Sequence, residues 1–281
     1  MNHEALNVPD WKKYSADKGS EVFCMKAIGI WLEQALVDNS KSLRLFSPDE
    51  LASNKLDDVF NHTGHDFQWN EFSHAKGGRV IEILSEHTCQ GFLQEYAHWP
   101  YPGIIHTMMV QYSKFNKMAD ETDWRTDISS INYIETSIWM RQEHNEFSHQ
   151  NPSFIGAVFN LKPTAARVYL PPDAVSFPTQ CRNRSTNLVK DTFLSTIAHC
   201  LRSKNYVSLM IGSKQPQPVS LSVQEANKHC QAGASVWKFT STDDGLNPDV
   251  VLVGIGFELT FKVVLAAAIL LKSAPPCESE W

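Results

Sequence analysis

The sequence predicts an α/β protein whose mainly parallel sheet is flanked by helices. Short runs rich in β-branched residues alternate with stretches of helical periodicity, which is the pattern of βαβ units. Polar segments directly follow two of these runs, at the strand ends where parallel sheets bind ligands. The net charge of −6 provides no basic surface for nucleic acid, which argues against that class of partner.

The strands and helices of the first 218 residues follow from these patterns in chain order. Apolar and β-branched runs predict strands at 42–46, 79–84, 129–137, 166–170 and 206–212. Apolar residues at helical spacing predict helices at 21–37, 53–63, 88–96, 103–119 and 194–203. Residues 214–219, KQPQPV, have the proline content of a linker and are expected to end a domain that spans residues 1–218.

A second, shorter unit is expected at residues 219–281. Helical patterns at 222–233 and 258–272 enclose one apolar run, 249–256, that reads as a strand. One strand and its helix cannot enclose a core, so this unit is expected to be a truncated C-terminal α/β piece. Glu258 and Lys262 interrupt its apolar stretch, which leaves runs shorter than the roughly 20 residues of a membrane helix.

The cytoplasm is the expected compartment. The first residues are polar and lack the apolar core of a secretory signal. The six cysteines are scattered without a CxxC pair, which argues against both a disulfide framework and a zinc ribbon.

Two polar segments are candidate sites. Glu86 follows the predicted strand 79–84, and the segment 141–150, RQEHNEFSHQ, follows the predicted strand 129–137. The alternative is that 141–150 is a solvated loop without a function and that Glu86 is an ordinary exposed carboxylate. A zinc site could use His144 with His149, or His62 with His65, but neither spacing fits a usual metal template.

Several motifs in order resemble the middle domain of the phosphoketolases, thiamine diphosphate enzymes that split xylulose 5-phosphate or fructose 6-phosphate. They include FSPDELASNKLDDVF at 46–60, GGRVIEILSEHTCQGFLQ at 77–94, the segment 129–158 and HCLRSKNYVSLMIGSKQPQP at 199–218. The resemblance runs from Val8 to Lys272, and its wording is nearest to the fungal branch. It implies a pyrimidine-binding domain of the thiamine-enzyme type and an aldehyde-lyase activity that yields acetyl phosphate and an aldose phosphate.

The resemblance also assigns roles to residues. It places the glutamate that contacts the cofactor aminopyrimidine at Glu86 and implies Mg²⁺ as a companion of thiamine diphosphate. The residues expected to line the reacting carbons with it are Gln142, Asn145 and His149. The residues expected to bind the substrate phosphate are Ser53, Lys55, Arg125, His144 and Lys214.

The sequence departs from the family pattern in several places. The GDG…N segment that holds the cofactor diphosphate and Mg²⁺ in the family does not occur. Residues 97–102 stand where relatives have about twenty residues, and 175–191 form an irregular insertion, for which we hypothesise a retained intron. Glu146 replaces a glycine, which brings negative charge toward a phosphate site.

The chain is therefore expected to carry only part of an active site. The expected association is a homo-oligomer or pairing with an N-terminal phosphoketolase domain, because in the family the site forms between domains of two subunits. Two alternatives stay open: a catalytically inactive fragment or subunit that associates with a full-length phosphoketolase, and a metal-dependent hydrolase built on His144 and His149.

Overall fold

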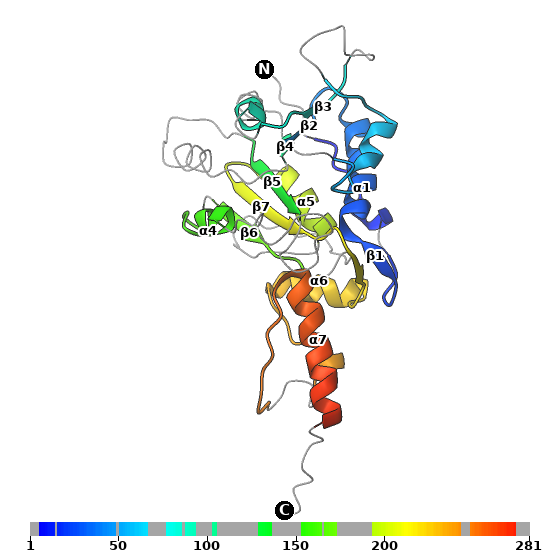
Figure 1. The fold of residues 1–281 in the computed structure, drawn as a ribbon, viewed down its shortest axis with the longest axis vertical. Helices are drawn as coiled ribbons and strands as arrows, with labels where there is room; N and C mark the ends of the chain where they lie inside the picture. Colours follow the sequence, from blue (N-terminus) through cyan, green and yellow to red (C-terminus); the bar gives the residue numbers. More distant parts are fainter. Residues whose placement is uncertain are drawn as a thin grey trace, which may run out of the picture.

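A parallel sheet forms the centre of the molecule (Figure 1). The computed structural model describes residues 6–14, 16–48, 51–66, 77–85, 88–93, 103–105, 129–136, 153–164, 166–172, 193–242 and 248–273. Within these ranges six strands pair in the order β3-β2-β4-β5-β7-β6, and every pair is parallel. The strands are β2 (Arg44–Ser47), β3 (Val80–Glu82), β4 (Gly103–Ile105), β5 (Ile131–Thr136), β6 (Ala166–Tyr169) and β7 (Val207–Gly212).

Helices cover both faces of the sheet because alternate strand residues point to opposite sides. On one face α1 (Cys24–Asp38) and α5 (Phe193–Arg202) pack into an apolar cluster that includes Ile134 of β5. On the other face residues 88–93, which are helical, and α4 (Ser153–Phe159) pack into a cluster that includes Tyr133. The predicted α/β class with a mainly parallel sheet flanked by helices is confirmed.

The five predicted strands are confirmed as β2, β3, β5, β6 and β7, but two neighbouring expectations were wrong. Residues 103–105, predicted to begin a helix, form β4, which fills the gap between β2 and β5. The predicted helix 53–63 is a turn followed by the short 3-10 helix η2 (Asp57–Asn61). Lys55 has a φ of 62°, a left-handed conformation that a right-handed helix cannot contain.

Two short strands join the start of the chain to the predicted linker. β1 (Glu21–Phe23) takes the first residues of the predicted helix 21–37 and pairs antiparallel with β8 (Pro216–Pro218). Gln217 is 2% exposed, so residues 214–219 are packed against the domain and are not a free linker. In this two-stranded sheet the prolines lie at an edge, where a missing N–H is tolerated.

The C-terminal part projects from the sheet as α6 (Val223–Ala232), the 3-10 helix η4 (Lys238–Thr240) and α7 (Gly256–Ser273) (Figure 1). The structure assigns no strand to 249–256, so that expectation was wrong. The first turn of α7 is buried, and the Phe257 ring lies 6.2 Å from that of Phe193. No helix in the described ranges combines the length and the apolar character that crossing a bilayer requires.

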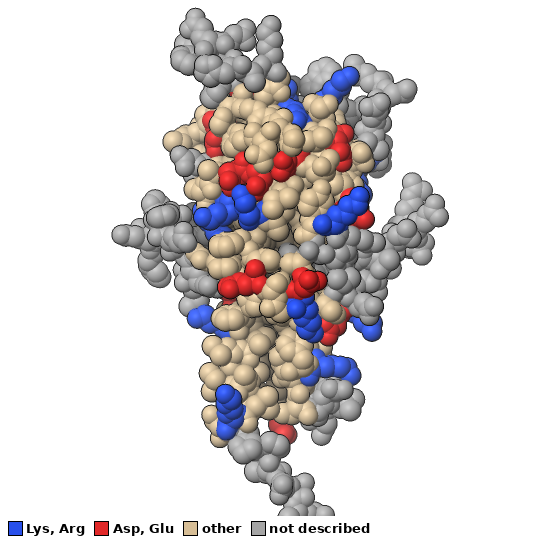
Figure 2. All heavy atoms as spheres, turned by 90° about the vertical axis from the view of Figure 1, so that its right-hand side faces the viewer, with Lys and Arg blue, Asp and Glu red and all other residues tan. Residues whose placement is uncertain are grey.

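Apart from the buried residues at its start, α7 exposes apolar side chains, and so does the segment before it. They are Val250, Val251, Leu252, Val253, Ile255, Leu259, Phe261, Leu265, Ile269, Leu270 and Leu271. Figure 2 shows the same lower part of the molecule with few charged groups among tan atoms. We call this set the α7 apolar surface.

Candidate active site

The carboxyl ends of the parallel strands meet at one edge of the sheet, where α/β proteins bind ligands. The strand register places Ser47 of β2 beside Glu82 of β3, and Thr136 of β5 beside Gly212 of β7. Two of these positions, Glu82 and Thr136, hydrogen bond to the loop that follows β2. The described part of the candidate site is built on this edge.

That loop contains a tight turn at residues 51–56, which we call the phosphate turn because it carries Ser53 and Lys55, two of the residues predicted to bind the substrate phosphate. Three backbone bonds close it: Asn54 N–H to Leu51 O at 3.1 Å, Lys55 N–H to Ala52 O at 3.0 Å, and Leu56 N–H to Leu51 O at 2.9 Å. Leu51 and Leu56 are buried in the apolar cluster under α1, whereas Ser53 is exposed and Lys55 is partly exposed. Sequence and packing thus fix the two ends of the turn and present the polar residues between them.

Side chains from the sheet edge hold the phosphate turn. Glu82 Oε1 accepts from the Leu51 N–H at 2.6 Å, and the Thr136 hydroxyl donates to Asn54 Oδ1 at 2.5 Å. The other oxygen of Glu82, Oε2, lies 2.5 Å from His65 Nε2. The turn is therefore anchored at its start and at its middle by two different strands.

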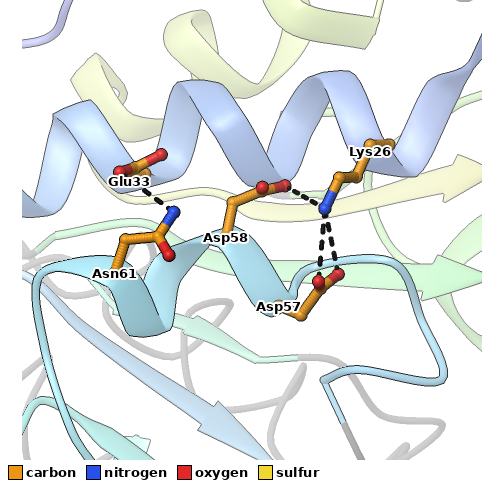
Figure 3. A network of polar contacts seen from close by, with 5 residues as sticks. All are labelled: Lys26, Glu33, Asp57, Asp58 and Asn61. Carbon is orange, nitrogen blue, oxygen red and sulfur yellow. Dashed lines mark hydrogen bonds and ion pairs between the residues drawn. The ribbon is translucent and has the colours of Figure 1, made fainter.

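Helix α1 supports the turn from behind. Gly29 of α1 leaves no room for a side chain, because an added Cβ would lie 3.0 Å from the Lys55 carbonyl oxygen and 3.2 Å from Leu56 Cα. Lys26, one turn earlier, lies 2.8 Å from Asp58 and 3.2 Å from Asp57 (Figure 3). The hydrogen bond to Asp58 raises the pKa of Lys26 above its ordinary value, so the ammonium stays charged.

The same network ties the next turn to α1. Asn61 of η2 donates to Glu33 at 3.3 Å (Figure 3). His62 Nε2 lies 3.0 Å from the same carboxylate. The exposed members of such a network each contribute little, but several together define where η2 lies. The zinc alternative needs His62 and His65 to face one metal ion. In the structure each imidazole contacts a different carboxylate, His62 that of Glu33 and His65 that of Glu82. Among the described residues no three His, Cys, Asp or Glu side chains are grouped to hold a metal ion.

A third element of the edge follows β7. Lys214 is partly exposed, and the residue before it, Ser213, is buried. Ser213 donates to Glu258 Oε1 at 3.1 Å, and Gln217 Nε2 donates to the same oxygen at 3.3 Å. Glu258 belongs to the buried first turn of α7, so the C-terminal helix fixes the segment that carries Lys214.

Glu135 is an unusual buried carboxyl next to this edge. It precedes Thr136 on β5, is 8% exposed, and pairs in register with Ile211 of β7. Burial raises its pKa to about 7, because the charged form loses hydration. No group in the described ranges hydrogen bonds to its Oε2. Such a carboxyl is half protonated near neutral pH and can either give or take a proton.

The structure describes three of the residues predicted for the site. Ser53 and Lys55 lie together on the phosphate turn, and Lys214 follows the neighbouring β7. Thr136 connects the two places, because it bonds to Asn54 of the turn and pairs with Gly212, two residues before Lys214. The other predicted residues lie outside the described ranges: Glu86, Arg125, Gln142, His144, Asn145 and His149.

Four residues of this edge were not singled out from the sequence: Asn54, Glu82, Glu135 and Thr136. Asn54 stands between two predicted residues in SNK, and Glu135 and Thr136 are the last two residues of the buried strand β5. A polar residue at the end of a buried strand is the signal that could have identified them. Their partners could not be read, because the Asn54–Thr136 bond joins residues 82 positions apart.

Comparisons with known proteins bear on this geometry. The sequence profile of D-xylulose 5-phosphate/D-fructose 6-phosphate phosphoketolase matches residues 26–184, and that of the XFP C-terminal domain matches residues 214–278. The chain belongs to the phosphoketolase family. A probable phosphoketolase from Schizosaccharomyces pombe is 48% identical over 96% of this chain and 32% of its own length. One from Rhodopseudomonas palustris is 39% identical over 97% of this chain and 35% of its own length.

The chain thus spans about a third of the length of these phosphoketolase relatives. Among solved structures, transketolase from Campylobacter jejuni superposes with a TM-score of 0.49 at 18% identity. That match covers 76% of this chain and 29% of the transketolase chain, and at this score it supports no conclusion about the site.

Proposed function

We propose that this phosphoketolase-family chain carries the pyrimidine-side part of a thiamine diphosphate-dependent active site. The complete site would cleave xylulose 5-phosphate or fructose 6-phosphate with inorganic phosphate, giving acetyl phosphate and an aldose phosphate, in cytoplasmic carbohydrate metabolism. The observation that carries the proposal is the phosphate turn, which presents Ser53 and Lys55 at the carboxyl edge of a parallel sheet. Family membership supports the reaction class.

The described polar groups of this edge suit a phosphate ester. A serine hydroxyl can donate to a phosphate oxygen, and lysine ammonium groups supply compact positive charge. We assign the substrate phosphate to Ser53, Lys55 and Lys214, with Arg125 and His144 completing the set. Lysine at position 55 gives charge without the two parallel donors of an arginine, so the phosphate is free to rotate about this contact.

The pyrimidine side of the cofactor would be held by Glu86, which follows β3 in the sequence. When bound, thiamine diphosphate supplies the electron sink for carbon–carbon cleavage. Glu86 would hold a proton against the pyrimidine ring nitrogen, and Gln142, Asn145 and His149 would hydrogen bond to the oxygens of the reacting carbons. Glu135 lies on the strand that leads into residues 141–150 and keeps a proton available near neutral pH.

We propose that the diphosphate and Mg²⁺ bind to an N-terminal phosphoketolase domain. The GDG…N segment that would hold them in the family is not present in this sequence. We also propose that the chain divides into a pyrimidine-binding domain at 1–218 and part of a C-terminal domain at 219–281.

A second candidate is a catalytically inactive subunit that associates with a full-length phosphoketolase. The α7 apolar surface favours it, because exposed apolar patches of this kind mark association sites. Glu146, which stands where the family has glycine, also favours this candidate, because its negative charge would weaken the binding of phosphorylated substrates.

Acetyl phosphate formation, trapped as the ferric hydroxamate, tests the proposal. The purified chain is given xylulose 5-phosphate, inorganic phosphate, Mg²⁺ and thiamine diphosphate, alone and with the separately expressed N-terminal part of the Schizosaccharomyces pombe relative. A Glu86→Gln variant is the control for cofactor-dependent chemistry. We expect activity only in the mixture and none with Glu86→Gln.

Each outcome separates the candidates. Activity in the mixture that Glu86→Gln abolishes supports the half-site. Activity of the chain alone would show that it contains the complete site and would refute the assignment of the diphosphate to a partner. Association with the relative without any acetyl phosphate would support the inactive subunit.

A further inference from the structure

The phosphate turn is tied to β5 by one buried side-chain pair. The Asn54 side chain is 0% exposed, and its Oδ1 accepts from the Thr136 hydroxyl at 2.5 Å. Thr136 is 8% exposed, so water has little access to this bond. A buried amide oxygen that lost this donor would have no water to replace it, which makes the bond costly to break.

The other end of the Asn54 amide reaches a residue assigned to the phosphate. Asn54 Nδ2 donates to Ser53 Oγ over 3.5 Å, a long contact. An amide that donates to this oxygen directs the hydroxyl hydrogen away from Asn54. The bonds from Thr136 to Asn54 and from Asn54 to Ser53 therefore make the orientation of the exposed Ser53 hydroxyl depend on the end of β5.

The end of β5 also lies beside the segment that carries Lys214, the other described residue assigned to the phosphate. Thr136 pairs in register with Gly212, and Gly212 is followed by the Ser213–Lys214 segment that Glu258 fixes. Because β5 and β7 are hydrogen bonded side by side, a bond from Thr136 to the turn fixes Ser53 and Lys55 relative to Lys214. The other anchor of the turn, Glu82, accepts from the Leu51 N–H at the start of the turn.

We propose that Thr136 and Asn54 are positioning residues of the phosphate site. They hold Ser53 and Lys55 in the geometry that binds a phosphate ester, without touching the ester themselves. The inference rests on the proposed function, since that assigns the phosphate to Ser53 and Lys55.

The test uses Thr136→Val, which keeps the shape of the side chain and removes the donor, and Thr136→Ser, which keeps the donor. Thr260→Val is the matched control, because it makes the same chemical change at a residue that is also buried, at 7% exposed, but lies on α7 and not on the turn or on β5. Fructose 6-phosphate and inorganic phosphate are titrated separately into each protein by calorimetry. Amide hydrogen exchange of residues 54–56 is measured without ligand.

We expect Thr136→Val to weaken binding of fructose 6-phosphate by roughly tenfold, the size of effect typical of a lost buried hydrogen bond. Its amides at 54–56 should exchange faster, while Thr136→Ser and Thr260→Val keep native affinity and native exchange at the turn. If Thr136→Val does not fold, Asn54→Asp replaces it. That variant keeps an acceptor for Thr136 but removes the donor to Ser53, and it should weaken binding at least as much.

Native affinity in Thr136→Val, or in Asn54→Asp if the first variant fails, would overturn the inference and leave the proposed function intact. Equal losses in Thr136→Ser and Thr136→Val would overturn it as well, because the hydroxyl would not be the cause. A native chain that binds neither fructose 6-phosphate nor phosphate would overturn the proposed phosphate site and this inference together.

Discussion

Replacing Glu135 with glutamine should stabilise the protein at alkaline pH and remove part of the pH dependence of its stability. Burial raises the pKa of this carboxyl to about 7 in the folded state, whereas its ordinary value is 4.5. Ionising this carboxyl in the folded protein leaves its charge without hydration. No described group hydrogen bonds to Oε2 in place of the lost water.

The sign and size of the effect follow from proton linkage. Below pH 4.5 the carboxyl is protonated in both the folded and the unfolded chain and costs nothing. Between pH 4.5 and 7 the unfolded chain releases the proton while the folded chain keeps it, so the free energy of unfolding falls as pH rises. The difference between 4.5 and 7 corresponds to about 3 kcal/mol, reached in full above pH 7.

Urea unfolding of the native chain and of Glu135→Gln at pH values from 4 to 8 measures this difference. The two proteins should be about equally stable at pH 4, and the variant should be more stable by up to about 3 kcal/mol at pH 8. Glu21→Gln, at an exposed position of β1, controls for the loss of one carboxylate. A constant difference between native chain and Glu135→Gln across this range would refute the account of Glu135 as a buried proton carrier.

Three further predictions concern other parts of the chain. Gly29→Ala should lower the free energy of unfolding by about 1 kcal/mol in urea denaturation, because crowding of the Lys55 carbonyl at 3.0 Å outweighs the better helix propensity of alanine. A stabilised variant would show that the turn moves aside easily. Ser222→Ala should cost about 1 kcal/mol in the same assay, since the side chain caps α6, and an unchanged midpoint would mean that the cap adds nothing to global stability. The native protein should bind a hydrophobic fluorescent dye on the α7 apolar surface, and the double variant Leu265→Lys with Ile269→Lys should reduce the dye fluorescence. Equal fluorescence of the two proteins would show that the dye binds elsewhere.

Local patterns were enough to predict most of the sheet. The runs that became β5 and β7 are buried on both faces, as strands in the middle of a parallel sheet are, and their β-branched residues were enough to predict them. β4 was missed because its three residues, Gly103–Ile105, open a longer stretch with helical spacing. Its position depends on β2 and β5, which pair with it from distant parts of the chain.

The phosphate turn shows the limit of periodicity as a guide. The spacing of Leu56, Val59 and Phe60 predicts a helix from residue 53, but the bond from Asn54 to Thr136 and the left-handed Lys55 produce a turn. Both causes are tertiary: the turn must pass Gly29 of α1 closely and must reach the end of β5. The resemblance to phosphoketolases predicted Ser53 and Lys55 as phosphate-binding residues without their geometry, and the structure shows the contacts that hold the turn that carries them.

The most direct test of the account is to map where a sugar phosphate binds. Backbone amide resonances of the native chain would be recorded while fructose 6-phosphate is added, with fructose as the control that lacks the phosphate. The account predicts shifts at the phosphate turn and at Ser213–Lys214, on the carboxyl edge of the sheet, that fructose does not reproduce. Phosphate-dependent shifts confined to α6 and α7, with none at the sheet edge, would contradict it.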